Sequence, residues 1–103
     1  MIVQFNTDHN IPASEAVREP LIALIKEELS DFSEHISRIE VHLTDQNGRK
    51  DGPNDKRCVL EARIEGLHPI AVTHDADTRD QAVEGALEKL RALVESTLER
   101  REP

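Results

Sequence analysis

Residues 55–76 read DKRCVLEARIEGLHPIAVTHDA, and this stretch decides the fold class. Between Cys58 and Ile64 every second residue is a core type and most of the others are charged, which is the period of a half-buried β-strand. Gly66 and Leu67 form the turn into another strand over about 68–74. Pro69 favours an edge position or a strand entry there. The stretch therefore predicts two consecutive strands.

A long helix follows these strands. Residues 78–81, Thr-Arg-Asp-Gln, fit a capping box, in which a hydroxyl and an amide satisfy backbone donors at a helix start. Core-type residues then recur at helical spacing: Val83, Leu87, Leu90, Val94 and Leu98. At about 100° per residue, an acidic stripe falls on the opposite side with Arg91 among it: Glu84, Glu88, Glu95 and Glu99. We interpret the stripe as a solvated face, with docking to a basic partner as the alternative.

The upstream elements complete the layout. Alternation predicts strands over 1–6 and 38–44, and an apolar stripe predicts a helix over 14–32. Pro20 lacks an N–H, so this helix either kinks there or begins at Pro20, and we favour the longer helix with a loose or bent first turn. The order β-α-β-β-β-α predicts an α+β fold, one domain over 1–103, with a four-stranded sheet and both helices on one face.

Composition limits what the chain binds. Apolar residues make up 37% of it, which is enough for a core, but Phe5 and Phe32 are the only aromatic residues. A surface that stacks on bases needs aromatic rings, so such a surface is not expected. The net charge is −8, from 21 acidic and 13 basic side chains. Nucleic acid and anionic membranes are repelled unless the basic residues gather on one face.

Basic residues lie in the long connection, on the third strand and on one flank of each helix. The connection over 45–55 has the Gly, Pro, Asp and Asn content that is typical of a long turn, and it carries Arg49 and Lys50. On the third strand, Arg57 and Arg63 share the side that does not face the core with Glu61 and Glu65. The helix flanks carry Arg18 and Lys26 on the first helix and Lys89 and Arg100 on the last. Spacing alone does not distinguish these residues from ordinary surface charge.

Motifs for catalysis or metal binding are missing from the sequence. There is no Gly-rich phosphate loop, no nucleophile elbow and no pair of histidines at metal-helix spacing, so we expect no enzyme activity, no cofactor and no small-molecule substrate. His42 and His74 are expected on one open sheet face, with His68 near in sequence. Without a cysteine or a convergent carboxylate they are interpreted as solvated, and no metal site is predicted.

Cysteine usage and hydropathy give two more expectations. Cys58 is the only cysteine, so no internal disulfide forms, and its strand position predicts a buried structural thiol. No charged-then-apolar leader precedes the first strand, and no apolar run approaches the roughly 20 residues that cross a bilayer. We therefore expect a cytoplasmic protein with no membrane contact.

Three segments resemble a known family. They are SEAVREPLIALIKEELSDFSEHISRIEVHL (14–43), DKRCVLEARIEGLHPIAVTHDA (55–76) and DQAVEGALEKL (80–90). Together with the element order, they resemble the ribosome hibernation-promoting factor and ribosome-associated inhibitor family, also called the sigma-54 modulation or S30AE family. The middle segment looks like a variant branch. The chain ends at Pro103, so we expect it to resemble the short members, which have no dimerisation domain.

The resemblance implies a fold similar to double-stranded RNA-binding domains and a place on the small ribosomal subunit, in the channel for messenger and transfer RNA. Members block initiation and preserve idle ribosomes under stress. Contacts to rRNA phosphates by Lys and Arg would carry this binding, with no DNA involved. Arg18 and Lys89 match basic positions by motif. Weaker matches, made by region, are Arg57, Arg63, Arg91 and Arg100.

This chain departs from the family pattern at the last helix. Members that bind ribosomes carry many lysines along this helix, whereas here its outer stripe is acidic. The rival hypothesis keeps the fold and gives it another use: a protein-interaction module that docks a basic protein partner through the acidic helix.

Overall fold

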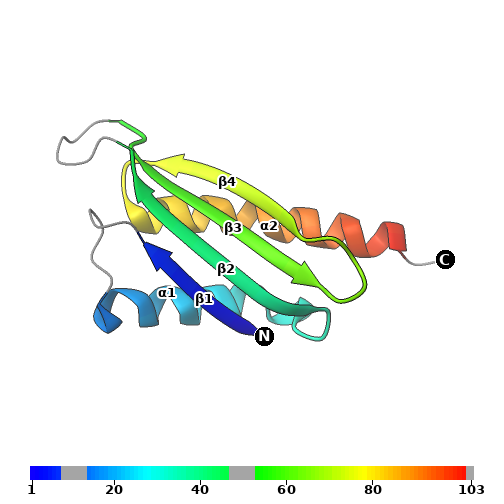
Figure 1. Cartoon of the computed structure of the whole chain (residues 1–103). Coiled ribbons are helices and arrows are strands. Elements are labelled where there is room, and N and C mark those ends of the chain that lie inside the picture. The colour runs from blue at the N-terminus through cyan, green and yellow to red at the C-terminus, as the bar shows by residue number, and fades with distance from the viewer. Residues whose placement is uncertain (8–13, 47–52, 102–103) are drawn as a thin grey trace.

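The predicted architecture is confirmed by a computed structural model, which describes residues 1–7, 14–46 and 53–101. Four strands form one sheet in the order β1-β2-β3-β4, and both long helices cover the same face (Figure 1). The other face is open. The elements are β1 (Ile2–Thr7), α1 (Glu15–Glu28), the 3-10 helix η1 (Ser30–Phe32), β2 (Ile36–Asp45), β3 (Lys56–Ile64), β4 (Ile70–Ala76) and α2 (Arg79–Arg101).

The connections follow from the element order. β1 pairs with β2 in parallel because α1 carries the chain back between them. β2, β3 and β4 are antiparallel neighbours. Gly66 has a φ of 81°, a conformation that glycine adopts without a steric penalty, and the Leu67 N–H donates to the Ile64 carbonyl in the same turn. The middle of the long connection, 47–52, lies outside the described residues.

One apolar layer between the sheet and the helices holds the fold together. Its largest fully buried side chains are Ile25, Leu29, Ile36, Ile39, Val41, Leu43, Cys58, Leu60, Val83, Leu90 and Val94. Phe5 and Phe32 are only half-buried at its margin. Burial raises the pKa of the Cys58 thiol to about 12, so this cysteine is an inert core residue, as predicted.

The first helix differs in detail from the prediction over 14–32. It ends at Glu28, and η1 supplies the remaining turn. Ser14 occupies the N-cap position with an extended backbone, but its hydroxyl makes no capping bond. Pro20 lies inside α1 on its exposed side, where the missing N–H takes one helical donor away from the carbonyl of Ala16.

β2 begins earlier than alternation predicts. A β-bulge between Ile36 and Arg38 lets Ile36 and Ile39 face the core although they are three residues apart. The extra residue in the bulge interrupts the period of two. The sequence pattern therefore showed only the part of the strand beyond it.

Candidate nucleic-acid interface

Arg57 lies on the open face of the sheet and is bound to Asp75 on the neighbouring strand. Its Nε lies 2.8 Å from Asp75 Oδ1 and its Nη2 3.1 Å from Oδ2, which is a two-pronged ion pair. The hydrogen bonds from Arg57 lower the pKa of Asp75, and those to Asp75 raise the pKa of Arg57. A phosphate that bound Arg57 would compete with this carboxylate.

Arg63 shares that open face and also has acidic neighbours. Its Nη2 lies 3.6 Å from a Glu40 carboxylate oxygen and 3.7 Å from one of Glu61. These longer contacts leave Arg63 exposed. Its cross-strand partner is Arg38, whose Nε is buried without a hydrogen-bond partner.

Arg38 is a cation that the sequence reading missed. Alternation placed it on the open side, but the bulge and the strand register that bring it opposite Arg63 cannot be read from spacing. The described part of the open face thus combines Arg38, Arg57 and Arg63 with Glu40, Glu61 and Asp75. Its charges balance, so it is not a basic patch.

Lys89 and Arg91 both lie on α2 but make different contacts. Lys89 Nζ donates to the Thr73 carbonyl at 2.9 Å, across the outer edge of β4. Arg91 reaches the end of the first helix, where it donates to the Glu28 carbonyl and pairs with Asp31 at 2.8 Å. Its guanidinium also lies 5.4 Å from the ring centre of Phe32.

Arg18 and Arg100 complete the predicted set. Arg18 is half-buried on α1, and its Nε has no hydrogen-bond partner among the described residues. Arg100 is exposed near the end of α2. The six predicted residues lie on the open face, at the β4 edge and on the helices. Arg57 and Lys89 both lie close enough to Asp75 to lower its pKa, whereas no contact among the described residues groups the other four with them. Their role in rRNA binding stays a prediction.

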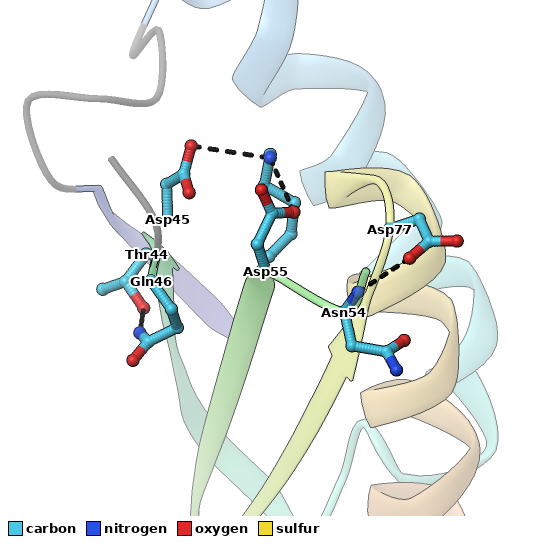
Figure 2. A network of polar contacts seen from close by, with 7 residues as sticks. Thr44, Asp45, Gln46, Asn54, Asp55 and Asp77 are labelled. Atoms are coloured by element: carbon cyan, nitrogen blue, oxygen red, sulfur yellow. Dashed lines mark hydrogen bonds and ion pairs between the residues drawn. The ribbon is translucent and has the colours of Figure 1, made fainter. Parts of the chain in front are cut away.

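The end of the sheet beside the long connection is held by a polar cluster (Figure 2). Asp55 is 2% exposed and accepts a 2.8 Å bond from Lys56 Nζ, which also lies 3.5 Å from Asp45. Hydrogen bonding to Asp55 raises the pKa of the Lys56 ammonium. The Asn54 N–H donates to Asp77 at 2.7 Å. Lys56 thus holds two carboxylates at this end of the sheet, and a phosphate would have to displace them.

The placement predicted for the histidines is wrong in one respect. His42 lies on the open face, but His74 pairs with Cys58 on the side facing the helices and lies against Gly85 of α2. The alternation of β4 starts at Ile70, so even-numbered residues face the core. Within the described ranges, no group of three or more His, Cys, Asp or Glu side chains is placed to hold a metal.

The family model for sigma 54 modulation protein / S30EA ribosomal protein matches residues 6–102. The chain belongs to this family. The match covers almost the whole chain and confirms the resemblance drawn from its segments. A comparison with curated proteins found no match.

Two solved structures share the S30AE fold of this chain. One is described as a ribosomal subunit interface protein from Coxiella burnetii, with 18% identity, a TM-score of 0.72, and coverage of 94% of this chain and 97% of that chain. The other is the Protein Y N-terminal domain from Thermus thermophilus, with 15% identity, a TM-score of 0.73, and coverage of 94% and 99%. At these identities the likeness establishes the fold.

The described helices of this S30AE chain give no candidate for a membrane span, since none is both long and apolar enough.

Proposed function

We propose that this S30AE protein is a ribosome-associated factor that binds the small subunit near the decoding channel and inhibits translation or stabilises idle ribosomes under stress. The family match over residues 6–102 carries the proposal. The partner is rRNA phosphate, without DNA, membrane or small-molecule substrate, and the place of action is the cytoplasm, where ribosomes are. The protein binds and occludes; it is not an enzyme.

The six proposed rRNA-binding residues fall into two groups, according to whether a carboxylate already binds them. Arg18 and Arg100 form no ion pair among the described residues, so they can bind phosphate at least cost. Lys89 forms no ion pair within 4 Å, but its ammonium lies close enough to Asp75 to lower the pKa of that carboxyl and already donates to the Thr73 carbonyl. Arg57, Arg63 and Arg91 must first exchange a carboxylate for a phosphate. Because the net charge is −8, every contact works against a repulsive field, and binding should be weak and sensitive to salt.

Sedimentation through sucrose gradients with small subunits tests the proposal. At low salt the protein should travel with the subunit, and raising the salt should release it. A protein that stays at the top of a low-salt gradient would overturn ribosome association.

A charge-reversal pair locates the contacts. Arg18→Glu with Lys89→Glu should abolish co-sedimentation. The matched control, Lys26→Glu with Arg79→Glu, makes the same change in net charge on the same two helices and should sediment nearly as the wild type. Equal loss in both would mean that total charge, and not these two residues, decides binding. Urea unfolding of each variant checks that the fold is retained.

One observation favours a second function, a protein-interaction module for a basic protein. Glu84, Glu88, Glu95 and Glu99 are all exposed along α2, as predicted, so a carboxylate row faces solvent. Such a row attracts a cationic protein surface and repels RNA. Capture of a basic protein by ribosome-free S30AE chain would support this function.

A further inference from the structure

A groove runs between the two helices on the side away from the sheet. At one end it is bordered by Ala16 and Pro20 of α1 and by Asp80 of α2, and at the other by Glu28 and Arg91. The two helices run in the same direction, so the groove follows both (Figure 1). The two adjoining hollows have volumes of about 240 and 380 Å³ and share Leu24 and Glu84. From Val17 to Glu28 the groove is roughly 16 Å long.

The floor of the groove is apolar. It consists of Val17, Leu21 and Leu24 from α1 and Leu87 from α2. Val17 and Leu24 are only partly buried, so they still expose apolar surface. Ala16 and Pro20 have short side chains, which keeps the wall low at this end. Covering this surface with an apolar side chain would be favourable.

The rim of the groove offers acceptors. Glu28, Glu84 and Glu88 are exposed and form no ion pair within 4 Å in the described part of the chain, although Glu28 lies close enough to Arg91 to raise its pKa. Glu28 is the last residue of α1, where the negative pole of the helix dipole adds to its charge. The Ala16 carbonyl has lost its usual helical donor to Pro20. The two rim cations are already occupied, Arg79 by Asp80 and Arg91 by Asp31.

From this combination we propose that the α1–α2 groove docks a basic, amphipathic helix of a partner protein. Leucine-like side chains of that helix enter over Leu24 and Leu87, and its Lys or Arg side chains pair with Glu28, Glu84 and Glu88. RNA does not fit, because its phosphates would meet unpaired carboxylates. A second copy of this chain does not fit either, because each copy carries a net charge of −8.

This inference rests on the interaction-module function and not on ribosome association, so it is tested on the purified chain without ribosomes. The probe is a fluorescein-labelled synthetic helix of about four turns, with Leu at i, i+3, i+4 and i+7 and Lys or Arg elsewhere. Fluorescence anisotropy at low salt should show saturable binding. Amide chemical shifts should change along 17–28 and 80–91 and not on β2 or β3. No binding at low salt would overturn the groove, whereas the interaction module is overturned only if the ribosome-free chain captures no basic protein.

The variants separate the groove from general charge. Glu84→Lys with Glu88→Lys should weaken binding at least about tenfold. Glu95→Lys with Glu99→Lys makes the same charge change on the same helix beyond the groove and should weaken it much less. Equal weakening, or shifts confined to the far end of α2, would overturn the groove while leaving the acidic helix as a docking surface.

Two further probes identify the occupant. A peptide in which Ser replaces every Leu should bind at least about tenfold more weakly, because only the charges remain. Spermidine should compete poorly for the same reason. Equal binding of the Ser peptide or strong competition by spermidine would mean that the rim attracts any polycation, and the proposal of a helical occupant would fail.

Discussion

At Gly85, α2 packs directly against the His74 ring of the sheet. A Cβ built there would lie 2.1 Å from Cδ2 and 2.6 Å from Cγ of His74. No side chain tolerates such distances, so the His74 ring occupies the space that the missing Cβ leaves. From the sequence, Gly85 is only a weak helix former inside a predicted helix, and its contact with His74 cannot be predicted.

This contact predicts that Gly85→Ala changes the free energy of unfolding in opposite directions in the wild type and in a His74→Ala background. In the wild type, Gly85→Ala should lower the free energy of unfolding by about 1 kcal/mol, because the ring must leave its site. In a His74→Ala background the same substitution should raise it by up to about 1 kcal/mol, since alanine is the better helix former. Urea unfolding of the four proteins measures both. A decrease in both backgrounds would mean that the ring is not the obstacle.

Asp75 predicts a pH dependence. Its pKa is lowered from 3.8 by Arg57, so the folded state binds its proton less readily than the unfolded state. The stabilisation is complete above the unfolded pKa and is lost as the pH falls through the folded value. Below about pH 4 the wild type should therefore lose stability more steeply than Asp75→Asn. The exposed control Glu84→Gln should follow the wild type. Parallel unfolding curves for all three would show that the pair contributes nothing.

Among the elements, α1 and α2 are tied together at one end by Arg91. Its guanidinium donates to the carbonyl of Glu28, the last residue of α1, and covers the Phe32 ring of η1. A cation at this place satisfies a terminal carbonyl and complements the negative pole of the helix. Resemblance assigned Arg91 to rRNA, whereas its contacts give it a structural role as well.

The structural role of Arg91 is tested by comparing the stability of three variants. The midpoint of urea unfolding should fall most for Arg91→Ala, less for Asp31→Asn, which removes only an exposed ion pair, and not measurably for Arg100→Ala. If Asp31→Asn falls as far as Arg91→Ala, the ion pair is the main contribution and the carbonyl and ring contacts are not.

The helices and strands differ in how far the sequence could predict them. The Thr78 hydroxyl caps α2 as predicted, since it accepts a 3.1 Å hydrogen bond from the Gln81 N–H. This contact was predictable because such a cap depends only on local spacing. The start of β2 was missed, because the bulge before Arg38 exists only in the pairing with β3. Likewise, the even-numbered side of β4 could be placed only once its first paired residue, Ile70, was known.

The whole molecule carries a net charge of −8 on a small surface. Like charges repel in the compact state, and salt screens them over a Debye length of about 10 Å at 0.1 M. The described ion pairs Arg57–Asp75 and Arg91–Asp31 act in the opposite sense, since salt weakens them. Exposed pairs contribute little, so net repulsion should dominate.

The melting temperature should therefore rise as NaCl is increased from about 10 mM to about 150 mM. Glu84→Lys with Glu88→Lys adds two positive charges at each position, which brings the net charge to −4, and its rise should be smaller. A melting temperature that falls with salt would show that the ion pairs outweigh the repulsion.

By itself, the sequence determined the order of the elements, the core side of most strands and the family, because periodicity and motifs are local properties of a chain. Only the tertiary structure decided which cations are already neutralised. Arg57 meets Asp75 across 18 positions and Arg91 meets Asp31 across 60. Ion pairs between residues so far apart in the sequence depend on strand register and on how the helices lie on the sheet. The groove between α1 and α2 has the same origin, since its floor and rim come from helices that meet only after folding.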